Sequence, residues 1–106
     1  MHHIEAEVLI ANVLKRREKV SIRELIDIEE KITKKFSSIN ILLSNSTIYF
    51  AIQYYPEIFK WNDKYIQRTE KYNDICNDHY LDSLLNYQIP ENLKSEFLSS
   101  IAEYAK

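Results

Sequence analysis

Glycine is absent from this chain of 106 residues. Loops that wrap the phosphates of nucleotides need the backbone freedom of glycine, so a P-loop or a dinucleotide-binding turn of the usual kind is excluded. Tight turns must use Asn, Asp or Ser instead, because these residues tolerate left-handed backbone angles better than the others.

Cysteine and long apolar runs are also scarce. The single cysteine, Cys76, cannot form a disulfide within the chain. No run approaches the roughly 18 uncharged apolar residues that a transmembrane helix needs. Glu5 and Glu7 interrupt the charged-then-apolar order of a signal peptide. We therefore expect a cytoplasmic, reducing location and no membrane partner.

Residues that carry metal or acid–base chemistry are few and isolated. His2 and His3 are adjacent and would point in different directions on a helix. Cys76 and His79 are three residues apart and could share a zinc ion, but no further ligand stands at a recognised spacing. Cys76 has no activating partner other than His79, and no triad or carboxylate pair stands out. We expect no metal, no cofactor and no catalytic site, hence a binding protein and not an enzyme.

The composition that remains is that of one globular domain. Hydrophobic residues make up 45% of the chain and aromatic residues 12%, which is unlike a disordered protein. The formal net charge is -2, and it is unevenly spread: residues 1–71 carry 12 Lys and Arg against 10 Asp and Glu, and residues 72–106 carry 2 against 6. Such asymmetry can separate a nucleic-acid face from a partner face. Frequent Ile, Lys, Asn and Tyr fit an AT-rich genome, such as that of a virus or plasmid.

Periodic apolar residues predict three helices in the first half of the chain. The first covers residues 3–17. The second covers residues 22–36 and begins at a capping box formed by Ser21 and Glu24. The third starts within the N-cap candidates at residues 44–47 and ends near Tyr55, because Pro56 cannot continue it. The apolar residues 41–43 are expected to be buried, either as a turn of helix or as an extended piece.

A β-hairpin and two more helices are predicted after these. Residues 57–61 and 64–68 are rich in β-branched and aromatic side chains, and Asn62-Asp63 between them is a good turn for a chain without glycine. A fourth helix is expected at residues 74–87, and Pro90 is well placed to open the last one. That helix carries an apolar stripe, which can fold back onto the domain or form a dimer interface, and we favour the dimer. The stripe consists of Leu93, Phe97, Ile101 and Tyr104.

The order helix, short extended stretch, helix, helix, hairpin resembles the winged helix-turn-helix superfamily over residues 3–68. The resemblance rests on residues 20–25, 46–52 and 58–66, with aromatic residues on both sides of the hairpin turn (Phe59, Trp61 and Tyr65). It implies a mainly α fold with a small β-hairpin. We assign residues 1–72 to a winged-helix domain and residues 73–106 to a C-terminal helical extension.

The resemblance also implies a function, because the family's third helix enters the DNA major groove and its hairpin touches the backbone. Under this hypothesis a small, dimeric transcription regulator binds double-stranded DNA. The polar third-helix residues that would contact bases are Asn45, Ser46, Thr47 and Gln53. The basic residues that would contact phosphates are Lys34, Lys35, Lys60, Lys64 and Arg68.

Each of these groups also has a plainer interpretation. The polar third-helix residues can serve as caps and a hydrated face, and lysines on an edge hairpin prevent strand pairing between molecules. A cluster of aromatic residues can pack in the core or form a stacking surface: Tyr49, Tyr54, Tyr55 and Trp61. The third helix lacks Lys and Arg, which departs from the family's usual pattern. The net charge and the aromatic-rich third helix favour the alternative hypothesis of a winged-helix module that binds a protein complex, whereas the lysines of the hairpin favour DNA binding. We rank DNA binding first.

Overall fold

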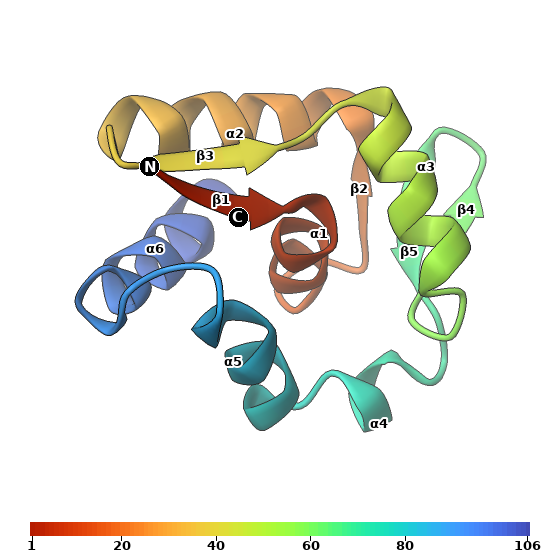
Figure 1. The fold of residues 1–106 in the computed structure, drawn as a ribbon. Helices are drawn as coiled ribbons and strands as arrows, with labels where there is room; N and C mark the ends of the chain where they lie inside the picture. Colours follow the sequence, from red (N-terminus) through yellow and green to blue (C-terminus); the bar gives the residue numbers. More distant parts are fainter.

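The computed structural model describes residues 1–106, and Figure 1 shows α1 near the centre with the other helices arranged around it. The helices are α1 (Ala6–Leu14), α2 (Ile22–Lys35), α3 (Asn45–Tyr54), α4 (Tyr72–Ile75), α5 (Asp78–Asn86) and α6 (Glu91–Tyr104). The strands are β1 (His2–Glu5), β2 (Lys19–Ser21), β3 (Ile39–Leu42), β4 (Phe59–Asn62) and β5 (Tyr65–Arg68). No helix is both long and apolar enough to cross a membrane.

Helix α1 is buried on almost every side because it is apolar around nearly its whole circumference. It packs against α3, α5 and α6. Its one buried polar side chain, Asn12, donates from Nδ2 to the Val8 carbonyl at 2.8 Å. The amide is therefore satisfied without a partner from another element.

Helix α2 begins where the capping box predicts. The Ser21 hydroxyl accepts a hydrogen bond from the Glu24 amide at 3.1 Å, and the Glu24 carboxylate accepts one from the Ser21 amide at 3.0 Å. Leu25, Ile28 and Ile32 face the core at helical spacing.

The predicted hairpin is confirmed and forms part of a small antiparallel sheet with strand order β2-β5-β4. Val20 pairs with Ile66, which pairs in turn with Trp61. The turn lies one residue later than expected, because Asn62 still pairs with Tyr65. Asp63 adopts a φ of 59°, the left-handed conformation that aspartate tolerates in the absence of glycine.

The N-terminal residues depart from the expectation. Residues 2–5 are not the start of the first helix but form β1, which pairs in parallel with β3 and places Ile4 beside Ile41. Both isoleucines are buried in the core. For residues 41–43 the sequence allowed either a turn of helix or an extended piece. In the structure residues 41 and 42 belong to β3, and residue 43 directly follows it. Burial of this long-range pair outweighs the local helical periodicity that runs through residue 4.

The C-terminal part differs in one element. The helix expected at residues 74–87 is broken at Cys76, because the Asn77 side chain accepts a hydrogen bond from the Tyr80 amide at 2.8 Å and starts a new helix, α5. Pro90 directly precedes α6, as expected.

One hydrophobic core joins the residues assigned to the winged-helix domain with those of the extension. Phe97 and Ile101 have no exposed surface, and α6 packs against α1 and α2. Tyr72 is also buried, and its hydroxyl donates to the Ala11 carbonyl. Residues 73–106 therefore complete the core built by residues 1–72.

Candidate functional site

The outer face of α3 carries the largest group of exposed aromatic side chains. Ile48, Ala51 and Ile52 turn inward, and this spacing directs Tyr49, Phe50 and Tyr54 outward. These three residues are 57%, 53% and 68% exposed. Figure 1 shows α3 next to β4 of the hairpin. We call Tyr49, Phe50 and Tyr54 the aromatic face.

The rings of the aromatic face are held in two pairs. Phe50 and Tyr54, one helical turn apart, are stacked with centroids 5.9 Å apart. Tyr49 lies against Trp61 of β4, with centroids 5.2 Å apart and ring planes at 44°. Such ring pairs are each worth about 0.5–1.5 kcal/mol beyond the area that they bury.

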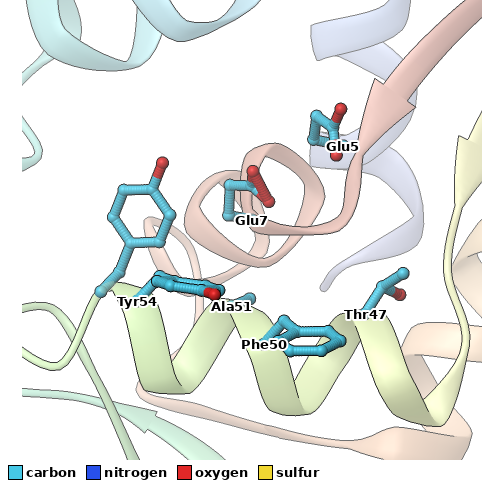
Figure 2. Close-up of a pocket in the computed structure, with 7 residues that line it drawn as sticks. Glu5, Glu7, Thr47, Phe50, Ala51 and Tyr54 are labelled. Carbon is cyan, nitrogen blue, oxygen red and sulfur yellow. The ribbon is translucent and has the colours of Figure 1, made fainter.

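A hollow of about 300 Å³ lies between the aromatic face and the start of α1. Figure 2 shows Glu5 and Glu7 on one side of it, across from side chains of α3. We call it the acidic hollow; its lining residues are Glu5, Glu7, Thr47, Phe50, Ala51, Tyr54 and Tyr55.

The two carboxylates of the acidic hollow are not neutralised within the chain. Neither Glu5 nor Glu7 is a member of any of the ion pairs in the structure. Burial raises the pKa of Glu7, and the charge of Glu5 raises it further. Burial and then the same two carboxylates raise the pKa of Tyr55. The hollow therefore holds two carboxylates, neither of which is paired with a lysine or arginine of this chain.

A second hollow, of about 500 Å³, lies on the other side of Tyr49, between the hairpin turn and the start of α2. Tyr49 and Trp61 form its aromatic wall, and Arg23, Asp63 and Lys64 bring charges of both signs. The candidate surface is thus acidic at one end and mixed in charge at the other.

The polar residues predicted to contact bases lie around the aromatic face. Thr47 is engaged in the cap of α3, because its hydroxyl accepts a hydrogen bond from the Ser44 amide at 2.8 Å. Asn45, Ser46 and Gln53 are exposed. The centre of the face is aromatic and uncharged.

The structure brings together only some of the basic residues predicted to contact phosphates: Lys60 and Arg68 line one hollow on the hairpin, and Lys34 and Lys35 lie elsewhere. Lys34 and Lys35 end α2, whereas the hairpin lies beside its beginning (Figure 1). Lys60 lies 3.4 Å from the Glu70 carboxylate. Arg68 donates to the Leu14 carbonyl at 3.2 Å. Lys64, at the hairpin turn, is exposed and in no ion pair.

The apolar stripe on α6 is used within the chain. Phe97 and Ile101 are fully buried, and Leu93 and Tyr104 are half-buried. A dimer interface through Phe97 and Ile101 would require α6 to leave the core. The stripe could either pack onto the same chain or form a dimer interface, and in the structure it packs onto the same chain.

The two residues considered as zinc ligands, Cys76 and His79, lie in different environments. Cys76 is in the core, and burial raises the pKa of its thiol to about 11, whereas His79 is exposed. No group of three or more His, Cys, Asp or Glu side chains is arranged to hold a metal ion.

The sequence interpretation did not identify Glu5, Glu7 and Phe50 as surface residues of a site. For Phe50 a signal was present, because a helix that buries Ile48, Ala51 and Ile52 must direct residue 50 outward. For the two glutamates no local signal exists, since their position beside α3 follows from the packing of α1 on α3.

Comparison with models of known protein families, with curated protein sequences and with solved structures found no match.

Proposed function

We propose that this chain is a winged-helix module that binds a protein partner through the aromatic face of α3 and the adjoining hairpin. The observation that carries the proposal is the joint exposure of Tyr49, Phe50 and Tyr54 on one helix. Several large aromatic side chains exposed on one element of a folded protein are typical of an interaction site.

The winged-helix part of the proposal is supported by the order of elements. Helix α1, strand β2, helices α2 and α3 and the hairpin β4–β5 follow one another with one additional strand, β3, between α2 and α3. The hairpin also pairs with β2, so that it is held beside the helices.

A protein is a better partner for this face than a nucleic acid. Tyr, Trp and Phe are enriched at the centres of protein interfaces, where charged residues are depleted. Helix α3 contains no Lys or Arg, and the carboxylates of Glu5 and Glu7 lie at its side. Phosphates brought close to this helix would meet negative charge and few compensating cations.

Affinity capture from the cells that make the protein tests this function. The chain should retain one stoichiometric protein, and Tyr49→Ser combined with Tyr54→Ser should abolish its retention, since hot-spot aromatics cost about 2 kcal/mol or more each when truncated. The matched control is Tyr87→Ser, which removes a tyrosine that is 94% exposed outside the face. Equal retention by both variants would show that the aromatic face is not the interface.

DNA binding is the second candidate function, and one local observation favours it. Lys64 and Arg23 line the hollow beside Tyr49 and Trp61. Asn45 and Gln53, each one helical turn from Tyr49 on α3, are exposed. Fluorescence anisotropy with a mixed-sequence duplex at low and high salt decides between the candidates. Salt-sensitive binding at micromolar protein that Lys64→Glu weakens would favour DNA, whereas unchanged anisotropy is the result that our proposal requires.

A further inference from the structure

We infer that the acidic hollow receives an arginine side chain of the protein partner. The inference rests on the proposed function and names the chemistry of the partner at one point of the interface. Three independent features of the hollow support it: its size, its charge and its aromatic wall.

The hollow is large enough to admit one side chain of a partner. Its volume of about 300 Å³ lies at the lower end of the roughly 300–1,000 Å³ that small-molecule sites occupy. It opens beside the stacked rings of Phe50 and Tyr54. A partner that covers the aromatic face therefore covers the mouth of the hollow as well.

The charge of the hollow calls for a cation. Glu7 is half-buried and Glu5 is exposed, and neither has an oppositely charged partner in this chain. Covering them with a neutral or acidic surface would remove two carboxylates from water without compensation, which is costly. A cationic side chain of the partner would instead supply the positive charge that pairs with these carboxylates, so the hollow favours a cationic side chain over a neutral or acidic one.

The aromatic wall favours arginine over lysine. The planar guanidinium can stack on the exposed rings of Phe50 or Tyr54 and at the same time donate two parallel hydrogen bonds to a carboxylate. The compact ammonium of lysine cannot satisfy both surfaces in this way. The hollow has aromatic rings on one side and carboxylates on the other. A guanidinium can stack on the rings and donate hydrogen bonds to the carboxylates, so it fits both sides.

An NMR titration of the whole chain tests the inference with two peptides. The first has one central arginine in a short glycine-rich sequence, and the second has citrulline, which is neutral and nearly the same shape, in its place. The arginine peptide should shift the backbone amides of Glu5, Glu7, Phe50 and Ala51, and it should bind about fivefold or more tightly than the citrulline peptide. Raising the salt concentration should reduce the difference in affinity between the two peptides, because salt screens the attraction between arginine and the carboxylates.

Two double variants complete the test. Glu5→Gln with Glu7→Gln should reduce arginine affinity to that of citrulline. Glu96→Gln with Glu103→Gln removes the same two charges from exposed positions of α6 and should leave the preference unchanged. Equal affinity for both peptides, shifts centred outside the hollow, or no shift at millimolar peptide would each overturn the inference. If capture of a partner by the aromatic face persists in such a case, only the arginine assignment fails.

Discussion

Tyr72 and Cys76 show how single residues set the stability of the core. The Tyr72 hydroxyl donates to the Ala11 carbonyl, so this buried polar atom is paired with the backbone of α1. Burial raises the pKa of Tyr72 far above its usual range, and burial also raises the pKa of Cys76 to about 11. Both groups are therefore held neutral in the folded protein.

Alkaline pH should destabilise the protein through Cys76 first. Unfolded chains release the thiol proton at the ordinary pKa of 9.0, whereas the folded protein holds it up to about 11. The stabilisation is thus complete below pH 9 and declines as the pH rises from 9 toward 11. Urea denaturation at pH 7, 9 and 10 should show a falling free energy of unfolding, and Cys76→Ala should flatten this decline. An identical slope in the variant would contradict the assignment to Cys76.

At the scale of elements, caps decide where the helices begin. Four neighbouring residues were candidates for the cap of α3, and the structure selects Ser44, whose hydroxyl accepts from the Thr47 amide at 3.2 Å. Local spacing alone does not distinguish Ser44 from Ser46, because both lie in the polar run that precedes Ile48. The paired strand β3 ends at Leu42, and Ser44 two residues later is still in the extended conformation that a cap requires.

Replacing Ser44 and Ser46 separately tests this choice. Ser44→Ala should destabilise the protein by about 1 kcal/mol, the usual cost of losing a cap. Ser46→Ala, which changes an exposed side chain within the first turn, should lie within about 0.5 kcal/mol of the unchanged protein. Chemical denaturation measures both, and a larger loss for Ser46→Ala would place the cap elsewhere.

At the scale of the whole molecule, α6 behaves as part of one core. Phe97 is fully buried and α6 contacts both α1 and α2. Phe97→Ala should therefore cost about 3–5 kcal/mol, the range for aromatic residues truncated in cores. Tyr87→Ala, at an exposed position between α5 and α6, serves as the control and should change stability little. Calorimetry should show a single transition, whereas a separate transition for residues 73–106 would mean that two units fold independently.

Local chemistry was sufficient to predict much of this molecule. The capping box at Ser21, the hairpin around Asp63 and the start of α6 after Pro90 each depend on residues adjacent in sequence. The pairing of β1 with β3 was not predictable in this way, because its partners are 37 residues apart and their strands are short. The acidic hollow was missed for the same reason, since it forms only when α1 packs on α3.

The most direct test of a protein-binding face is to identify what touches α3 in the cell. A photoreactive phenylalanine analogue can replace Tyr54, which is 68% exposed on the face, or Tyr87, which is 94% exposed outside it. After irradiation, position 54 should yield one discrete adduct that protease removes and nuclease does not, and position 87 should not yield that adduct. A nuclease-sensitive adduct at position 54, or the same adducts at both positions, would contradict the account.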